Sequence, residues 1–527
     1  MTNWNAAWRE QALPELAARD WDLVVVGGGI SGAGILREAA RRGWKCLLLE
    51  QRDFAWGTSS RSSKMVHGGL RYIAKGQFGL TRDSVRERER LLQEAPGLVD
   101  PLSFIMAHYQ GGFPGPKVFG CLLAVYDALA GKRNHLYYPL QRLRYLAPGI
   151  KEGGLLGGTR FFDAVTDDAR LVQRVLGEAR AEGAEALNGM RVVELLRENG
   201  RVTGLLAEDS ETGLRYSFKT RAVAQATGAW ADQLRRKTGL EHIRPLRGSH
   251  LLLAAWRLPV AHAFSFMHAS DKRPVFVFPW EGATVIGTTD LDHPAPLAEE
   301  ARISPDEVTY LLDACAQQFP AAGIGAADVL STWAGVRPVV SDGEPGRKPS
   351  DEKREHALWV EPGCVTLAGG KLTTFRLLAL EVLQACAPMV GRIVDDHGAA
   401  TFAAVSSQPM PTLSPAQQKR LIGRYGRALP QLLAMIDELG VEPVVGTDTL
   451  WAELAWAAEQ ELVLHLDDLL LRRTRLGLLL AQGAAAELPR IRALCQARLG
   501  WDDARWQQEE QDYLALWQRC YSLRIGD

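Results

Sequence analysis

The chain has 527 residues, of which 46% are apolar and 23% are charged, and its formal net charge is −1 at pH 7. This length predicts two to four domains with substantial hydrophobic cores. Charges of both signs are mixed along the chain, so no basic stripe indicates a nucleic-acid partner. The seven cysteines are scattered, with no C-x-x-C pair and no paired histidine spacing. They predict reduced thiols in a cytosolic protein and argue against a metal site.

The N-terminal segment, residues 1–20, contains acids and lacks an apolar core of signal-peptide length. It predicts a short amphipathic helix and no export signal. No apolar run along the chain approaches the roughly 20 residues that a membrane-spanning helix needs. We therefore expect no transmembrane segment.

The next segment predicts a strand, a tight turn and a helix. Leu23–Val26 is short and mostly β-branched, as in a strand that is buried on both faces of a parallel sheet. Gly27, Gly29 and Gly32 follow with the spacing G-x-G-x-x-G. Glycine permits both a tight turn and the close approach of a ligand to the backbone. Because Ala33–Arg42 is helical in character, its free N–H groups and positive dipole end would face an anion over the glycines.

A second apolar strand, Lys45–Leu49, ends at Glu50, eighteen residues after Gly32. An acid in this position accepts hydrogen bonds from the ribose hydroxyls of an adenine dinucleotide. Its carboxylate would repel a 2′-phosphate, which argues against NADP. FAD and NAD remain as candidates.

The segment from Gln51 to Tyr72 carries small hydroxyl residues and glycines where a plain nicotinamide domain would have an apolar helix. Such a segment offers many short donors to a long ligand. Its part TSSRSSKMVHGGLRY, together with GGGISGAG, resembles FAD-dependent glycerol-3-phosphate dehydrogenase, the flavin type. The resemblance is strong over about residues 20–400 and looser beyond. The later segments that resemble this family, in the same order, are ATGAW (226–230), RGSH (247–250), DKRPVFVFPW (271–280), IGTTD (286–290), GVRP (335–338) and GGKLTTFR (369–376).

The resemblance implies FAD as the cofactor. A helix from about Leu372 to Ala385 follows Gly369, Gly370 and Lys371. The dipole of that helix would stabilise a reduced flavin, which is anionic around N1 and O2. The cofactor-binding residues that we predict are Gly27, Gly28, Gly29, Ser31, Gly32, Glu50, Gln51, Thr58, Ser59, Ser60, Ser63, Lys64, His67, Gly228, Gly370, Lys371, Leu372 and Thr373.

We expect an α/β fold with three parts. A Rossmann-like FAD-binding domain covers residues 20–405, and an antiparallel-sheet substrate domain is inserted in it, mainly at 240–360. After a linker at 406–415, an all-helical C-terminal domain runs to residue 527. Helices are expected at 167–183 and near 305–318, and a hairpin turn at Asn199-Gly200.

Three further segments are predicted to be helical. Two of them are expected to be exposed to solvent, and the third allows two alternatives. Arg82–Leu92 is charged, which predicts a solvated face. Leu471–Gly477, LRRTRLG, is predicted to be an exposed helix seam. Val118–Tyr126 is nearly all apolar between cations, so it is either a buried core helix or a helix in the membrane interface. The related dehydrogenases are peripheral membrane enzymes that reduce quinone, which favours the second alternative and implies a cytoplasmic protein on the inner face of the membrane.

A small phosphorylated alcohol needs cations for its phosphate and a base for its hydroxyl proton. By resemblance, Arg337 and Lys371 lie in ligand-contacting motifs and are expected to act in catalysis as well as in binding. His67 and His250 are both candidates for the proton acceptor, or structural residues near the flavin, and we give His67 the catalytic role. The substrate-binding residues that we predict are Arg71, Tyr72, His250, Arg337, Arg354 and Lys371.

The resemblance implies oxidation of sn-glycerol 3-phosphate to dihydroxyacetone phosphate, with hydride transfer to FAD and electrons passed on to a quinone. An oxygen-using oxidase or an amine oxidase of the same fold is the nearest alternative. A non-catalytic flavin-binding sensor is an alternative of another class. The oligomeric state is left open, with a homodimer as one candidate.

Overall fold

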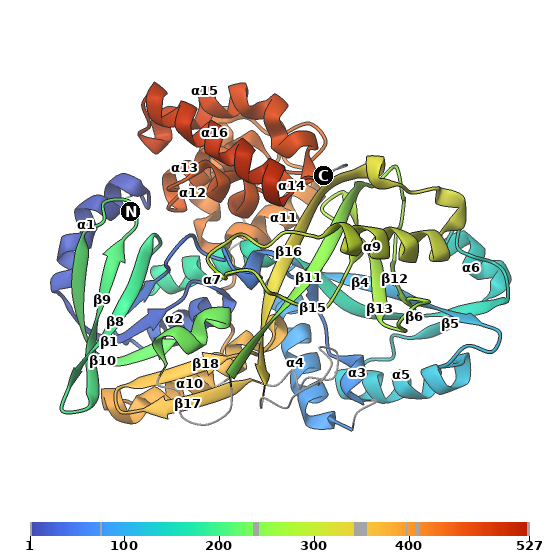
Figure 1. Ribbon diagram of the computed structural model, residues 1–527, viewed down its shortest axis with the longest axis horizontal. Helices are drawn as coiled ribbons and strands as arrows, with labels where there is room; N and C mark the ends of the chain where they lie inside the picture. Colours follow the sequence, from blue (N-terminus) through green and yellow to red (C-terminus); the bar gives the residue numbers. More distant parts are fainter. Residues whose placement is uncertain are drawn as a thin grey trace.

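A computed structural model describes residues 3–73, 76–235, 242–341, 356–396, 398–405 and 410–523. The described strands form one sheet of eight strands and one of ten, and the C-terminal helices lie across one side of both (Figure 1). This arrangement confirms the expected α/β class with a separate helical C-terminal part.

The eight-stranded sheet is the nucleotide-binding sheet. Its main path runs β17-β18-β10-β1-β2-β7, and the neighbouring pairs from β18 to β7 are parallel. β8 and β9 pair antiparallel with each other, and β9 pairs with the first half of β10. The strands are β1 (Asp20–Val26), β2 (Cys46–Leu49), β7 (Glu185–Leu187), β8 (Met190–Glu198), β9 (Arg201–Asp209), β10 (Arg215–Gln225), β17 (Ala357–Glu361) and β18 (Cys364–Ala368).

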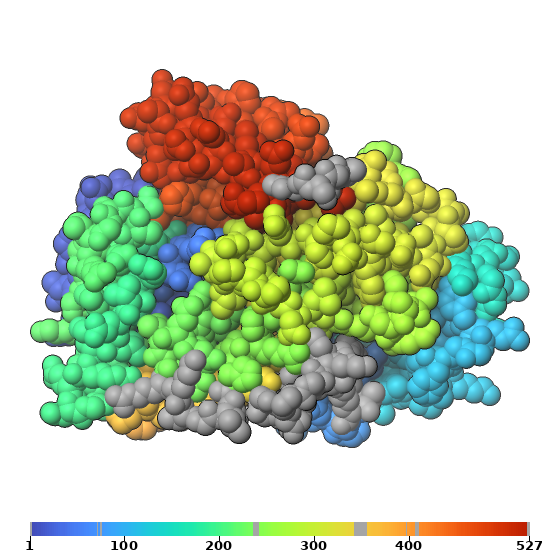
Figure 2. Space-filling model, in the orientation of Figure 1, coloured from blue at the N-terminus to red at the C-terminus, as the bar shows by residue number. Residues whose placement is uncertain are grey.

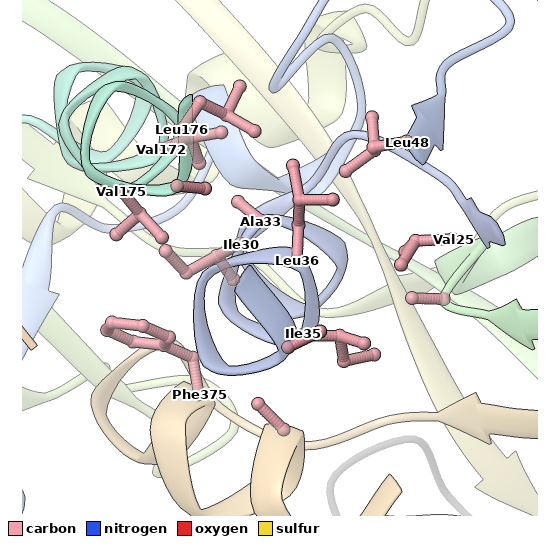
Figure 3. Packing of buried hydrophobic residues seen from close by; sticks show 14 of the residues in the cluster. Val25, Ile30, Ala33, Ile35, Leu36, Leu48, Val172, Val175, Leu176 and Phe375 are labelled. Carbon is pink, nitrogen blue, oxygen red and sulfur yellow. The ribbon is translucent and has the colours of Figure 1, made fainter. Parts of the chain in front are cut away.

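Three helices cover one face of this sheet. α2 (Ile30–Ala40) lies between α7 (Asp168–Ala181) and α10 (Phe375–Val390), and apolar side chains from all three helices meet there (Figure 3). On the other face, α1 (Ala6–Ala18) buries Leu13 and Leu16 against the sheet. This double cover explains why the strand sequences are continuously apolar instead of alternating.

The ten-stranded sheet forms the second layer, with the main order β15-β11-β14-β13-β12-β4-β6-β3. β16 pairs with β11, and β5 pairs with β6. The sequence placed this domain mainly at 240–360, but β3 to β6 come from residues 65–166. The strands are β3 (Met65–Val66), β4 (Val99–Tyr109), β5 (Leu136–Pro139), β6 (Leu155–Thr166), β11 (His242–Ala254), β12 (Ala263–Met267), β13 (Pro274–Trp280), β14 (Ala283–Gly287), β15 (Leu291–Asp292) and β16 (Val329–Ser341).

Helices flank this sheet on its outer side and at its end. α9 (Pro305–Gln318) has the predicted bounds and a capping box at Ser304. α3 (Leu70–Ile73), α4 (Phe78–Glu94) and α5 (Pro116–Ala130) lie along the lower part of Figure 1, and α6 (Leu140–Leu146) lies at its right edge.

The charged helix α4 is not simply a solvated helix, which corrects the sequence prediction in part. Glu87 and Arg88 are buried. Arg88 binds Asp163, and Glu87 binds Arg376 of α10. A buried charge needs a partner, and both partners are remote in sequence, so the helix pattern alone could not reveal them.

Helix α5 combines the two alternatives that the sequence left open. Phe119, Leu123 and Tyr126 are buried and pack on the rest of the protein. Val118 and Val125, on the same helix, are 47% and 42% exposed. The helix therefore has a core face and an exposed apolar face.

The C-terminal domain is helical, as expected, and its leucine and tryptophan stripes form its core. The predicted exposed seam at Leu471–Gly477 is wrong, because Arg472, Arg473 and Arg475 are all buried in ion pairs with the FAD-binding domain. The domain consists of α11 (Pro415–Tyr425), α12 (Leu429–Leu439), α13 (Trp451–Gln460), a π-helical turn (Asp468–Arg473), α14 (Leu476–Leu479), α15 (Leu488–Leu499) and α16 (Asp503–Cys520).

One described helix, Leu372–Val390, is long and apolar enough to cross a membrane, contrary to the expectation that no such run exists. Its most apolar window is 67% buried inside the protein. It packs against α2, so its apolar character is explained by the core of the nucleotide-binding domain.

Candidate active site

The glycine-rich turn after β1 has the predicted shape. Gly27 has a φ of +109°, which a residue with a side chain rarely adopts. A Cβ on Gly32 would lie 1.9 Å from the carbonyl oxygen of Gly27, so the helix can approach the strand only because Gly32 has no side chain. Gly29 precedes α2 without a side-chain cap of its own, and the first helical N–H, that of Ile30, donates to Ser59 Oγ at 3.0 Å. The N–H groups of the next residues in the first turn are the ones that a ligand can reach.

Glu50 ends β2 beside this turn. Its carboxylate accepts hydrogen bonds from the backbone N–H of Gly28 at 2.6 Å and of Arg52 at 2.9 Å. Burial raises the pKa of Glu50 above the ordinary 4.5, although the two N–H donors act in the opposite direction. The carboxylate is thus fixed at the place where the sequence predicted the ribose acceptor.

A cavity of about 560 Å³ runs from this turn to residues 369–372, which precede α10. It passes the loop Gly57–Lys64 and Gly228, three residues after the end of β10. Among the predicted cofactor residues, those that line it are Gly27, Gly29, Ser31, Glu50, Gln51, Thr58, Ser59, Gly228, Gly370, Lys371 and Leu372. Trp56, Trp230 and residues 190–193 of β8 also line the cavity, and the sequence did not predict them. Nothing in the sequence of a meander strand indicates that the strand contacts a ligand.

The remaining predicted cofactor residues stand behind this lining. Lys64 is fully buried, and its Nζ donates to the carbonyl oxygen of Ser60 at 2.5 Å and to Asp168 at 2.8 Å. Ser63 Oγ lies 2.9 Å from Nε2 of His250. The Thr373 hydroxyl lies 3.2 Å from both the backbone N and the backbone O of His67. Gly28 and Gly32 shape the turn itself, so these residues support the cavity without lining it.

The donor set and the shape of the cavity fit FAD. A helix N-terminus over three glycines suits a pyrophosphate, and Glu50 suits the adenosine ribose. At the other end, Gly369 and Gly370 have φ values of +76° and +84° and bring bare backbone to the cavity just before Lys371. Backbone that a ligand can approach closely, beside a lysine, suits the anionic edge of a reduced flavin.

His250 lies on β11 of the ten-stranded sheet. Its ring stacks on Trp333 of β16 with centroids 4.8 Å apart and planes at 12°. The pKa of His250 lies well below 6.5 because the ring is buried and because Arg337 and Lys64 are near. The imidazole is therefore neutral at pH 7. Its buried Nδ1 has no hydrogen-bond partner among the described residues.

Arg337 lies on β16, opposite Leu246 of β11, and its side chain is 23% exposed. Nη1 donates to Asp290 at 3.0 Å, and Nη2 donates to Thr288 Oγ1 at 3.0 Å. A Cβ on Gly248 would lie 2.3 Å from Nη2, so the glycine of RGSH leaves room for the guanidinium. Three segments of the resemblance, RGSH, IGTTD and GVRP, thus meet at one guanidinium group.

Lys371 lines the cavity and meets Tyr72. The Lys371 Nζ lies 3.6 Å from the centroid of the Tyr72 ring. Arg71 lies in α3, and its side chain is outside what the structure describes. Arg354 also lies outside the described residues. Of the predicted substrate residues, the described side chains of Tyr72 and Lys371 lie together. Arg337 lies near enough to His250 for its charge to lower the pKa of the histidine.

A buried cluster that the sequence did not reveal holds the segment HGGLRY. One carboxylate oxygen of Asp163 accepts from the Gly68 N–H at 3.0 Å, from Tyr126 at 2.5 Å and from Arg88 at 2.6 Å. The three side chains come from β6, α5 and α4. Because the bonds join parts far apart in sequence, only the tertiary structure shows them.

Comparison with known proteins decides the family. Residues 22–376 match the family model described as FAD dependent oxidoreductase, and residues 367–506 match the model described as the C-terminal domain of alpha-glycerophosphate oxidase. The chain belongs to the FAD-dependent oxidoreductase family. Its cofactor is FAD, as the sequence predicted, and the cavity described above has the residues to bind it.

Within this family, the resemblance to the glycerol-3-phosphate dehydrogenases is confirmed. The chain is 35% identical to glycerol-3-phosphate dehydrogenase 2 of Mycobacterium tuberculosis, over 97% of this chain and 90% of that protein. It is 33% identical to the aerobic glycerol-3-phosphate dehydrogenase of Bacillus subtilis, over 88% of this chain and 89% of that protein.

Solved structures agree with this assignment. The structure of the glycerol-3-phosphate dehydrogenase from Bacillus halodurans complexed with FAD superimposes with a TM-score of 0.76 at 25% identity, over 97% of this chain and 98% of that one. The L-alpha-glycerophosphate oxidase of Mycoplasma pneumoniae gives a TM-score of 0.57 at 17% identity, over 73% of this chain and 98% of that one. The second likeness shows the shared fold.

Proposed function

We propose that this protein oxidises sn-glycerol 3-phosphate to dihydroxyacetone phosphate and passes the electrons to a quinone. The observation that carries the substrate is the meeting of RGSH, IGTTD and GVRP at Arg337, in a protein similar to glycerol-3-phosphate dehydrogenases. When bound, FAD supplies the acceptor for the hydride that leaves C2.

The chain's own residues have two tasks. The first is to hold the phosphate dianion, for which Arg337 offers a planar fork and Lys371 a point charge. Arg337 already donates to Asp290 and Thr288, so its fork is held in one orientation before the substrate arrives. The Lys371 ammonium lies over the face of the Tyr72 ring, and this contact orients it.

The second task is to take the hydroxyl proton of the substrate. A base must be unprotonated to do this, and the low pKa of His250 keeps its ring neutral. His67, which the sequence favoured, remains a candidate, because its loop is fixed by the Thr373 hydroxyl and by Asp163. We expect one of these two histidines to accept the proton at a ring nitrogen.

We further propose that the protein lies at the inner face of the cell membrane. The support is the exposed face of α5 and the loop before it, where Phe113, Val118 and Val125 are 84%, 47% and 42% exposed. Lys117, at the start of the helix, would meet lipid phosphates, whereas Lys132, just beyond its end, pairs with Glu89 at 2.5 Å. This part of the chain forms the lower right edge of the molecule (Figure 2). A quinone is a membrane-soluble acceptor, so docking on this edge would bring the two together.

The matched C-terminal domain also occurs in an oxidase, so oxygen is the alternative acceptor. The two acceptors are distinguished by measuring hydrogen peroxide and the reduction of a soluble quinone analogue side by side, with glycerol 3-phosphate as substrate. We expect quinone reduction matched mole for mole by dihydroxyacetone phosphate. Stoichiometric peroxide with no quinone reduction would make the protein an oxidase. Absence of dihydroxyacetone phosphate with either acceptor would reject the proposed substrate.

A further inference from the structure

The buried seam of the C-terminal domain reaches the loop that lines the FAD cavity. After the π-helical turn, Arg475 has a left-handed backbone, with φ of +64°, and its side chain is 2% exposed. This turn and α7 of the FAD-binding domain are in contact. The segment Leu471–Gly477, which the sequence placed on the surface, is thus an internal connection between two domains.

All three guanidinium nitrogens of Arg475 have partners. Nε donates to Asp167 at 2.9 Å, and Nη1 donates to the carbonyl oxygen of Leu471 at 2.7 Å. Nη2 donates to the carboxylate of Asp168 and, at 3.2 Å, to the carbonyl oxygen of Ser60. The last contact is to the loop Gly57–Lys64 itself.

Asp168 accepts hydrogen bonds from two further residues of the loop, Ser62 and Lys64. Its Oδ2 accepts from the backbone N–H of Ser62 at 2.9 Å and from the Ser62 hydroxyl at 2.7 Å. Its Oδ1 accepts from Lys64 and from Arg475. Because Thr58, Ser59 and Ser62 line the FAD cavity, the loop faces FAD on one side and this ion cluster on the other.

The cluster depends on a cation from the C-terminal domain. Burial alone would raise the pKa of Asp167, but Arg475, Arg424 and Lys64 hold it below its ordinary value. Arg424 and Arg475 both belong to the C-terminal domain. Without Arg475, Asp168 would keep Lys64 as its one ion-pair partner among the described residues. An incompletely paired buried carboxylate is costly, so the loop would rearrange.

We propose that Arg475 is a positioning residue for FAD, through which the helical C-terminal domain completes the cofactor site. Arg475 does not line the FAD cavity. It holds the Ser60 carbonyl and the Asp168 carboxylate in the geometry that presents Thr58, Ser59 and Ser62 to the cavity. The C-terminal domain is therefore part of the cofactor-binding machinery of this chain, whatever the substrate is.

The test compares FAD binding by three full-length variants. Arg475→Leu removes the fork, Arg475→Lys keeps one charge without the fork, and Arg490→Leu is the control, because Arg490 pairs with Glu442 on the surface of the same domain. FAD is removed from each protein, and its dissociation constant is measured by titration of the flavin fluorescence. The unfolding midpoint of each apoprotein is recorded in parallel.

We expect Arg475→Leu to raise the FAD dissociation constant by about ten-fold or more. Arg475→Lys should give an intermediate value, and Arg490→Leu should match the wild type. Ethylguanidinium added to Arg475→Leu should restore part of the affinity, which a general loss of stability would not do. A wild-type dissociation constant in either folded Arg475 variant would overturn the proposal. If both variants fail to fold, the proposal is also overturned, because Arg475 would then serve general stability.

Discussion

At one end of the FAD cavity, Gly27, Gly29 and Glu50 come from a single stretch of chain. What we call the second end comes from three distant segments: Lys371 lines the cavity, and His250 and Arg337 lie on β11 and β16, outside its lining. The first end is built by a strand, a turn and a helix that are consecutive, so its geometry is set locally. The second end exists only when two sheets have assembled. Substitutions at the two ends should therefore change different quantities, cofactor affinity at the first and substrate selection at the second.

The largest expected effect separates the two ends most clearly. Arg337→Ala should lower kcat/KM for glycerol 3-phosphate by about ten- to a hundred-fold, since a lost charged contact costs roughly 1.5–3 kcal/mol. Glycerol has no phosphate, so feeble activity on it should change little. Steady-state kinetics with both substrates measure this preference.

The control for Arg337 is Arg244→Ala, which removes a cation of the neighbouring strand that pairs with Asp292. It should leave the preference unchanged, and both variants should bind FAD as the wild type does. Full preference for the phosphorylated substrate in Arg337→Ala would place the phosphate elsewhere.

Lys371→Ala should have a similar effect on glycerol 3-phosphate, again about ten- to a hundred-fold in kcat/KM. Unlike Arg337, Lys371 lines the FAD cavity as well as touching Tyr72, so its loss should also change the flavin. A shifted flavin absorption spectrum or a lower reduction potential is the second readout. A variant that loses substrate selection with an unaltered flavin would assign Lys371 to the phosphate alone.

Glu50→Ala should act at the first end only. It should raise the dissociation constant of FAD by about ten-fold or more, because the carboxylate would no longer accept the ribose hydroxyls. Once saturated with FAD, the variant should keep its preference for the phosphorylated substrate. Equilibrium dialysis of FAD, followed by kinetics at saturating FAD, checks both statements.

The pH dependence of FAD binding gives a sharper test of Glu50. The ionised carboxylate is the better acceptor, so affinity should be full at neutral pH and fall as the pH drops through the pKa of Glu50. Burial raises that pKa above 4.5, so the loss should begin at a higher pH than for an ordinary glutamate. Glu50→Gln should bind FAD with little of this pH dependence. An identical pH profile in Glu50→Gln would remove Glu50 from the site.

The smallest effect on either end is expected from the exposed face of α5. The double variant Val118→Asp, Val125→Asp should weaken binding to anionic vesicles by about ten-fold or more, since two apolar contacts are replaced by charges. Flavin reduction by the substrate in solution should not change. Val445→Asp is the control, because Val445 is 76% exposed in another domain. Unchanged vesicle sedimentation of the double variant would contradict membrane docking through α5.

The local elements could be predicted from the sequence because the signals that specify them are adjacent in it. β1, the turn at Gly27, β2 and Glu50 form one such unit, and α9 has the bounds that the sequence predicted. The residues of the substrate end were assigned by resemblance. Their assembly at Arg337 depends on the pairing of β16 with β11, which no local pattern determines.

The predictions failed where the partner of a charge lies far along the chain. Arg88 and Arg475 have the spacing of surface residues, but both are buried. Arg88 forms an ion pair with Asp163 and Arg475 forms one with Asp167, each on another element. Periodicity reports which side of a helix is polar. It does not report whether that side meets water or a buried carboxylate. For the same reason, the connection between the C-terminal domain and the FAD loop could be seen only in the structure.

The central claim, that the second end of the cavity selects a phosphorylated alcohol, is tested most directly by anaerobic flavin bleaching. The FAD-loaded protein is mixed without oxygen with glycerol 3-phosphate, glycerol or glycine, and the flavin absorbance near 450 nm is followed. The account predicts rapid bleaching with glycerol 3-phosphate and little with the other two. Bleaching by glycine, or a flavin that stays oxidised with all three, would contradict it.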